Sequence, residues 1–271
     1  MNSESNNNLF NPSLTPNSKS LIPFILSLGD HSLIAGHRNS EWCGHGPILE
    51  QDIAITNISL DLIGQARNFY QYAATLIGNG ATEDTLAYLR SANEFKNCIL
   101  FELPKGDWAF TIVRQFFFSN FQWLYFQELQ NSRDEQLAAI AAKSLKEVTY
   151  HLRWSSEWVI RLGDGTEESH NRLENALEEL WSFTGELFTP AEYEQEAFKA
   201  GFGVNVSALK AAWEQKVNEI FAEATLPDAA TGGREGVWMQ AGGKEGIHTE
   251  QLGFILAELQ YMQRAYPGAE W

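Results

Sequence analysis

The sequence is poor in cysteine, poor in basic residues, and free of long apolar runs. Its two cysteines, Cys43 and Cys98, are too few for a disulfide framework and form no Cys-x-x-Cys pair, which favours a reducing cytoplasm. Only 19 Lys and Arg residues face 35 Asp and Glu residues, for a formal charge of -16. Nucleic acid and anionic lipid both require a basic surface, and a membrane span requires roughly 20 apolar residues. We therefore expect a cytoplasmic protein that binds neither nucleic acid nor membrane.

Hydrophobic and aromatic residues are abundant. They make up 44% and 13% of the 271 residues, with 9 Trp and 17 Phe, which is enough for a sizeable core. The length lies near the upper limit for one core, and no long Pro/Gly/Ser linker divides the chain. The Asn-, Ser- and Pro-rich beginning lacks this apolar content. The sequence predicts a disordered leader over residues 1–18 and a single domain over residues 19–271.

Apolar residues recur at intervals of three and four along most of the chain, as in helices that bury one face. Four stretches are long, and Thr82, Asp107, Thr166 and Thr249 stand where helix N-caps are expected. The prediction is an all-α protein, a ferritin-like four-helix bundle with additional helices. The expected long helices cover 20 to about 44, 48–78, 108–130 and 134–162; shorter helices start at 82 and cover 166–187, 191–200, 206–224 and 249–265.

A ferritin-like bundle can hold two iron ions through four carboxylates and two histidines, with Glu-x-x-His on each of two helices. In the second long stretch Asp61 is a possible carboxylate ligand, but Gly64 occupies the histidine position. In the fourth, Glu147 is followed three residues later by Tyr150, and His151 comes one residue too late. The middle of the third, 116–123, has no acidic residue. We expect these positions to be degenerate, with no metal ligands and no catalytic residues in this chain.

Two other Glu-x-x-His matches are present, Glu167 with His170 and Glu245 with His248. The first falls in the first turn of a predicted helix, where acidic residues complement the helix dipole, and the second spans Gly246. We interpret both as chance. No Walker or Rossmann glycine pattern and no Gly-x-Ser-x-Gly elbow occurs.

A Gly-rich segment, 231–246, is the one long loop that the pattern predicts inside the domain. Arg234 and Lys244, followed by a helix that begins after Thr249, are weak candidates for an anion-binding cradle. The simpler interpretation is a mobile connector that becomes ordered against a partner. Substrate-binding residues therefore stay open.

Four long motifs resemble the C-subunit family of bacterial phenylacetyl-CoA epoxidase complexes. They are EWCGHGP (41–47), DIAITNISLDLIGQAR (52–67), AKSLKEVTYHLRW (142–154) and HTEQLG (248–253). The resemblance extends from about residue 20 to residue 271. It implies a ferritin-like structural subunit that pairs with a homologous A subunit, the carrier of the di-iron centre and the substrate. It also implies a small B subunit and a reductase subunit with flavin and an iron-sulfur cluster. The whole complex is expected to use O2 and NADPH to epoxidise the ring of phenylacetyl-CoA.

This resemblance is consistent with the missing ligands, and no cofactor is then expected in this chain. Asp61, Arg67, Glu147 and His151 are expected to form a buried network of ion pairs and hydrogen bonds instead, because charges away from water need partners. Two alternatives remain. One is an autonomous metal-dependent oxygenase with an irregular site made of Glu41, Asp61, Glu147 and His151, and the other is a coenzyme A binding module that uses Arg234 or Lys244.

Overall fold

The chain folds into helices joined by short loops, and the computed structural model describes residues 16–228 and 236–269. No strand is assigned within these ranges, so the all-α prediction is confirmed. The helices follow one another as α1 (Pro16–Ser40), α2 (Leu49–Ile77), α3 (Glu83–Tyr88), η1 (Ala92–Glu94), α4 (Ile99–Glu102), α5 (Trp108–Leu129), α6 (Glu135–Gly163), α7 (Glu167–Trp181), α8 (Gly185–Phe188), α9 (Glu192–Ala200), α10 (Val206–Glu223), η2 (Gly243–Glu245), α11 (Glu250–Leu259) and α12 (Tyr261–Ala265).

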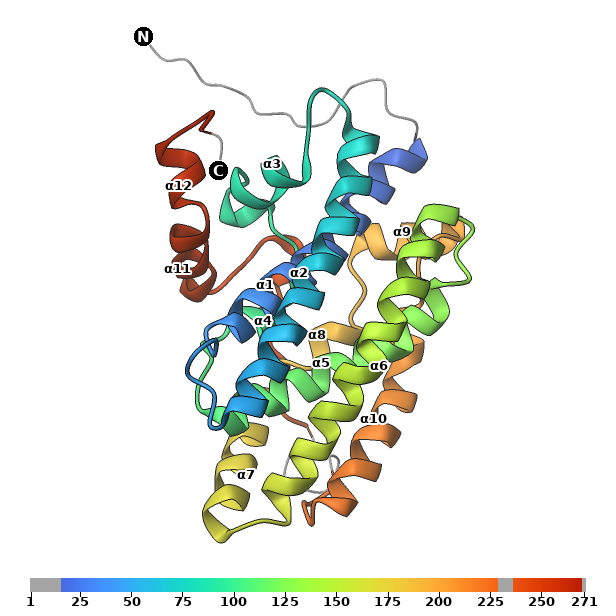
Figure 1. The fold of residues 1–271 in the computed structure, drawn as a ribbon. Helices are drawn as coiled ribbons and strands as arrows, with labels where there is room; N and C mark the ends of the chain where they lie inside the picture. The colour runs from blue at the N-terminus through green and yellow to red at the C-terminus, as the bar shows by residue number, and fades with distance from the viewer. Residues whose placement is uncertain (1–15, 229–235, 270–271) are drawn as a thin grey trace.

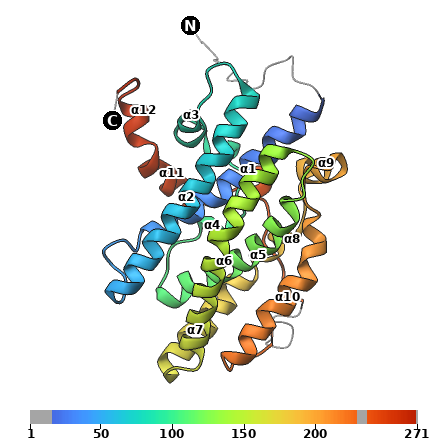
Figure 2. The same ribbon diagram turned by 45° about the vertical axis from the view of Figure 1, so that its right-hand side comes forward.

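Four long helices form the bundle as two hairpins, α1 with α2 and α5 with α6 (Figure 1). Short connections join the members of each pair, and α2 also packs on α6, which brings the hairpins together. Helices α7 and α10 lie against α5 and α6 at one end of the bundle, while α9 packs on α1 (Figure 2). This arrangement is that of a ferritin-like bundle with additional helices.

Helix α5 lies at the centre of the core. Every residue from Thr111 to Gln122 is buried, including the consecutive phenylalanines 116–118 that the pattern assigned to the core. The ring centroid of Phe117 lies 5.3 Å from that of Trp213 and 5.9 Å from that of Trp181. Aromatic side chains from α5, α7 and α10 thus fill the space between these helices.

The predicted N-caps are confirmed. The side chains of Thr82, Asp107, Thr166 and Thr249 each accept a hydrogen bond from a backbone N–H in the first turn of the helix that follows. Each such bond satisfies a donor that the helix itself leaves free, and its loss costs about 0.5–2 kcal/mol. The starts of these helices are therefore fixed locally.

Two predicted helices are interrupted. The helix expected over 166–187 ends at Trp181, because the Thr184 hydroxyl donates to the Trp181 carbonyl and the chain turns before α8. The helix expected over 249–265 divides at Gln260, whose side-chain amide donates to the carbonyls of Ala87 and Arg90. The second break depends on hydrogen bonds to a segment far away in the chain, and the spacing of apolar residues carries no information about such bonds.

One predicted segment falls largely, and another partly, outside the described residues. Most of the predicted leader, 1–18, lies outside them, and α1 begins at Pro16. Residues 229–235 also lie outside them, and Arg234 of the Gly-rich segment is among these. Among the described helices, none is both long enough and apolar enough to span a membrane.

Candidate functional site

Polar side chains form a short ladder between α2 and α6, where the sequence places the degenerate ligand positions. His151 Nε2 lies 2.9 Å from Asp61 Oδ2, and Gln65 Nε2 donates to Glu147 Oε2 at 3.0 Å. Because α2 and α6 run in opposite directions, residues one turn apart on α2 meet residues one turn apart on α6 in reverse order. The ladder therefore connects the two hairpins of the bundle.

Helix α5 extends this ladder with an amide. Gln122 Nε2 donates to Gln65 Oε1 at 3.2 Å, and both glutamines are buried. A Gln side chain has one donating and one accepting end, and Gln65 uses both, toward Glu147 and Gln122. Glu147, Gln65 and Gln122 thus form a continuous chain of hydrogen bonds from α6 through α2 to α5.

The remaining positions considered as degenerate ligands or network members, Tyr150, Gly64 and Arg67, do not belong to the ladder. Tyr150 is exposed, and a Cβ built on Gly64 would meet no atom within 4 Å. The expected buried network of Asp61, Arg67, Glu147 and His151 is not formed as such: Asp61 with His151 and Gln65 with Glu147 are two separate contacts, and the Asp61 side chain is 38% exposed. Arg67 takes no part, because its side chain is 67% exposed and pairs with Glu83 at 3.3 Å. The reason is helical geometry, since six residues place Arg67 about 120° round the helix from Asp61.

The residues present do not fit a di-iron centre. None of the buried polar side chains of α5 is a carboxylate, and the one that contacts the ladder, Gln122, is a neutral amide where a carboxylate ligand is needed. In addition, Asp61 and His151 already bind each other. Within 16–228 and 236–269, no three His, Cys, Asp or Glu side chains are placed so as to hold a metal ion together.

Glu41, the remaining ligand of the irregular site, is engaged elsewhere. Arg38 NH1 donates to Glu41 Oε1 at 2.6 Å, at the end of α1. The chance interpretation of Glu167 and His170 also agrees with their contacts, because His170 Nδ1 bonds the Gly163 carbonyl at 2.7 Å and Glu167 is exposed.

A second polar centre, not anticipated from the sequence, fastens residues 242–249 to the body. Three buried glutamates do this: Glu102, Glu186 and Glu194. Glu186 Oε2 accepts from the Ile99 N–H at 2.8 Å, and its Oε1 accepts from the backbone N–H groups of Gly242 at 2.9 Å and Lys244 at 3.2 Å. Apolar periodicity carries no signal for such contacts, because these carboxylates bind groups far away in the chain.

Lys244 belongs to this centre. Its ammonium lies 2.9 Å from Glu194 Oε2 and donates to the Thr189 carbonyl at 3.1 Å. Although burial opposes the charge, Glu194 raises the pKa of Lys244. The weak candidate for anion binding is therefore a buried cation with a carboxylate partner, and its companion Arg234 lies outside the described residues.

His248 and Glu102 complete the fastening. His248 Nδ1 lies 3.1 Å from Glu102 Oε1, and Nε2 lies 2.9 Å from the Phe95 carbonyl oxygen. Burial alone would lower the pKa of His248, but the hydrogen bonds with Glu102 and Phe95 raise it. The other Glu102 oxygen accepts from the backbone N–H and the hydroxyl of Thr249, both at 3.2 Å. Both ring nitrogens of His248 are therefore engaged away from Glu245, which agrees with the chance interpretation of this Glu-x-x-His match.

Cys98 is buried beside His31. His31 Nε2 lies 3.1 Å from Cys98 Sγ, and Nδ1 is hydrogen-bonded to the Ser27 carbonyl. Burial raises the pKa of the Cys98 thiol and lowers that of His31 to about 4. Since thiolate is the reactive form of cysteine, a neutral thiol against a neutral imidazole is a packing arrangement without nucleophilic character.

Comparison with known proteins agrees with this geometry. The family model described as phenylacetic acid catabolic protein matches residues 11–271. The chain is 47% identical over 253 residues to a protein of Escherichia coli (strain K12) that is named as the C subunit of 1,2-phenylacetyl-CoA epoxidase, and the match covers 93% of this chain and 99% of that protein. The resemblance carried by the four motifs is therefore confirmed. The helical bundle, the degenerate ladder and these two matches together show that the chain belongs to the phenylacetic acid catabolic protein family.

Proposed function

We propose that this protein is the C subunit of a phenylacetyl-CoA epoxidase in aerobic phenylacetate degradation, and that its role is structural. In this proposal it pairs with a homologous A subunit, which carries the di-iron centre and the substrate, and the remaining subunits supply electrons through flavin and iron-sulfur cofactors. The observation that supports the structural role is the ladder, in which Asp61 is bound to His151, Glu147 is bound to the Gln65 amide, and the α5 position is the Gln122 amide where an oxygenase needs a carboxylate ligand.

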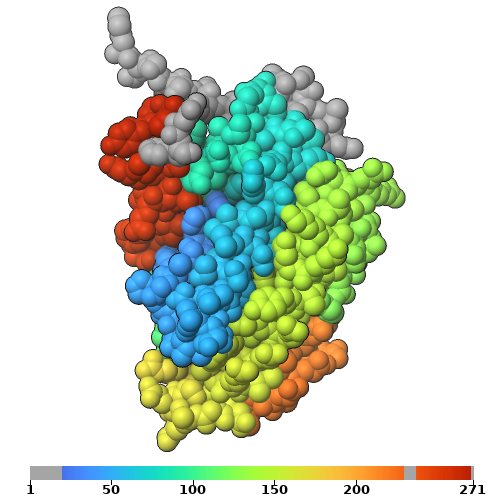
Figure 3. All heavy atoms as spheres, in the orientation of Figure 1, coloured from blue at the N-terminus to red at the C-terminus, as the bar shows by residue number. Residues whose placement is uncertain are grey.

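The outer face of α2 supports pairing with another subunit. Leu49, Ile53 and Leu60 are exposed, and Leu60 exposes 61% of its surface. They lie on one side of the helix and are followed on that side by Gly64, beside which there is open space. Figure 3 shows α2 at the surface next to α6. An exposed apolar stripe on a helix is typical of a protein–protein contact.

The complementary partner is a second ferritin-like chain. Such bundles bury apolar helix faces against one another, and a homologue of the same architecture offers a face of matching length. A chain that has this task no longer needs metal ligands, because its contribution to the complex is the surface it covers.

The experiment that tests the proposal is expression of the chain alone and together with a candidate A subunit, followed by elemental analysis of size-exclusion fractions. We expect iron near zero in the chain alone and a stable iron-containing complex on co-expression. Leu60→Lys should reduce complex formation, whereas Phe198→Lys, at an exposed position on α9, should not. About two irons bound to the chain alone would show an autonomous oxygenase and overturn the proposal.

A further inference from the structure

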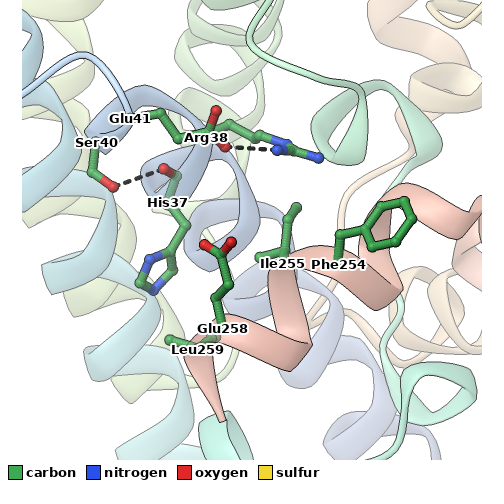
Figure 4. A pocket seen from close by; sticks show the side chains of 8 residues that line it. All are labelled: His37, Arg38, Ser40, Glu41, Phe254, Ile255, Glu258 and Leu259. Atoms are coloured by element: carbon green, nitrogen blue, oxygen red, sulfur yellow. Dashed lines mark hydrogen bonds and ion pairs between the residues drawn. The ribbon is translucent and has the colours of Figure 1, made fainter. Parts of the chain in front are cut away.

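Two places in the molecule hold polar groups that could bind a small molecule. One is a surface pocket of about 470 Å³ between the end of α1 and α11 (Figure 4). Glu258 and Phe254 in its lining are exposed, so bulk water reaches its polar groups and no bound molecule is required. The other place lies in the bundle core beside the ladder. Its polar groups are buried, and a buried polar group needs a partner inside the protein.

Two buried polar atoms of this core layer have no hydrogen-bond partner among the described residues. They are the hydroxyl oxygen of Ser32 on α1 and Oε1 of Gln122 on α5. Ser32 exposes 1% of its surface and Gln122 exposes 4%. The amide nitrogen of Gln122 already donates to Gln65, so the unpaired group on α5 is an acceptor, whereas the hydroxyl on α1 can donate.

The packing of α1 on α5 places these two residues at the same level of the bundle. Helix α1 is antiparallel to α2, α2 to α6 and α6 to α5, so α1 and α5 run in opposite directions. Asn39 on α1 donates to Gln115 on α5 at 2.6 Å. Ser32 comes seven residues before Asn39, and Gln122 comes seven residues after Gln115. Because seven residues make about two turns of a helix, the two positions face each other again one step along the pair.

The packing of α1 on α2 leads to the same level independently. A Cβ built on Gly36 would touch Leu62, and one built on Gly29 would touch the ring of Tyr70. The serine lies between these two glycines along α1. It therefore faces the part of α2 that contains Gln65, the residue to which the α5 amide is bonded.

The direction of the serine side chain agrees with this level. At 100° per residue, Ser32 points about 20° to one side of Asn39 and about 40° to the other side of Gly36. Asn39 faces α5 and Gly36 faces α2. The hydroxyl of Ser32 thus points between the two helices, toward the place where Gln65 and Gln122 meet.

The chemistry of this layer selects a neutral occupant. Ser32, Gln65 and Gln122 carry no charge, and a cation among them would be buried without a compensating charge. The layer offers one hydroxyl donor and two carbonyl acceptors, because Oε1 of Gln65 can accept a second hydrogen bond beside that from Gln122. One acceptor and two donors are what a water molecule provides.

We infer that one buried water molecule is bound in this layer, where it accepts from the Ser32 hydroxyl and donates to Oε1 of Gln122 and of Gln65. Internal waters in proteins make about three such bonds. The water connects α1 to the ladder, so that hydrogen bonds link all four long helices of the bundle. The inference goes beyond the proposed function and does not depend on it, since it concerns the chain by itself.

A crystal structure of the full chain, at a resolution that shows ordered water, is the first arm of the test. We expect one peak of electron density within about 2.6–3.2 Å of the three oxygen atoms. Ser32→Ala removes one of the three partners and should lower the occupancy of the peak or abolish it. The matched control is Ser59→Ala, because Ser59 is also buried but its hydroxyl donates to the Ile55 carbonyl of its own helix. The peak should be unchanged in this variant.

The second arm measures the transfer of magnetisation from water to the Gln122 side-chain amide by NMR, in the full chain labelled with 15N-glutamine. The resonance is assigned by its disappearance in Gln122→Leu. A water molecule held in the layer should give a transfer that falls at least twofold in Ser32→Ala and stays at the wild-type level in Ser59→Ala.

Three results would overturn the inference. They are a direct hydrogen bond between Ser32 and Gln122 without density for water, a metal ion at this position shown by elemental analysis of the same preparation, and equal transfer in Ser32→Ala and Ser59→Ala. The metal ion would also contradict the proposed function, whereas the other two results would leave it standing.

Discussion

The ammonium of Lys244 lies 2.9 Å from Oε2 of Glu194, and both side chains are almost completely withdrawn from water. This pair joins η2 to α9 across 50 residues of sequence. A buried charge that loses its partner keeps its desolvation cost, so removal of one member of such a pair destabilises a protein far more than the pair itself stabilises it.

Lys244→Met should therefore lower the free energy of unfolding by about 3–5 kcal/mol, because it leaves the Glu194 carboxylate buried and unpaired. Urea denaturation of the purified chain measures this. The exposed pair of Lys210 and Glu214 is the control, with 3.7 Å between its charged atoms, and Lys210→Met should cost about 0–1 kcal/mol. Equal losses in the two variants would mean that the Glu194 site admits water.

Glu147→Ala should destabilise the chain by about 1–3 kcal/mol, since the buried Gln65 amide loses its acceptor. Glu147→Gln keeps an accepting oxygen and should cost less. Thermal and urea unfolding give both values, and Glu157→Ala, at an exposed position on the same helix, should stay within about 0.5 kcal/mol of wild type. In the proposed epoxidase complex, turnover per complex should be unchanged in Glu147→Ala. A loss of turnover in fully assembled complex would give Glu147 a catalytic role.

Gly64→Ala should stabilise the isolated chain by about 0.5–1 kcal/mol, because glycine is a poor helix former and the added methyl group meets nothing. Gly253→Ala, at a similarly open position in α11, should give a comparable gain and controls for helix propensity. The proposed complex with an A subunit should respond in the opposite way and dissociate more readily in Gly64→Ala. Unchanged affinity, measured by titration of one polypeptide with the other, would place the interface away from this part of α2.

His248 should make stability depend on pH. Its two ring nitrogens face acceptors, the Glu102 carboxylate and the Phe95 carbonyl, and this arrangement favours the doubly protonated, charged form of the ring. Its pKa is raised above the ordinary 6.5. The stabilising contribution is thus complete below the unfolded-state pKa and is lost as pH rises through the folded-state pKa.

The free energy of unfolding should accordingly fall between about pH 6.5 and a pH above the raised value, and His248→Asn should remove this part of the decline. His45→Asn, at an exposed histidine in the loop after α1, should leave the decline in place. Urea titrations at closely spaced pH values provide the measurement. A decline that persists unchanged in His248→Asn would assign it to another group.

Much of the fold follows from local pattern. The starts of α5, α6 and α7 agree with the predicted ones within a residue, because each is set by a cap such as Asp107 or Thr166 close by in sequence. The break at Gln260 was missed, since its amide is held by carbonyls about 170 residues away in the chain. The spacing of apolar residues shows which face of a helix is buried, but it does not reveal a hydrogen bond to a distant part of the chain.

The candidate site was predictable to a similar degree. The absence of acid in the middle of α5 and the proximity of Asp61 to His151 follow from helical spacing within a known architecture. The involvement of Gln65 and Gln122 was missed, because an amide gives no sign in sequence of whether it is buried. Glu102, Glu186 and Glu194 were missed for the same reason, since acidic residues on amphipathic helices usually face water.

The complete burial of α5 from Thr111 to Gln122 also determines how the molecule exchanges its amide hydrogens with solvent. Helices at the edge of a bundle can open one at a time, and their amides exchange through small local fluctuations. Helix α5 is enclosed by the α1–α2 hairpin, α6, α7 and α10, so its central amides should exchange only when these helices separate from it. The hydrogen-exchange rate of amides in the middle of α5 should consequently measure the free energy of opening the entire bundle. A change in this rate when a partner binds would measure how much the partner adds to that free energy.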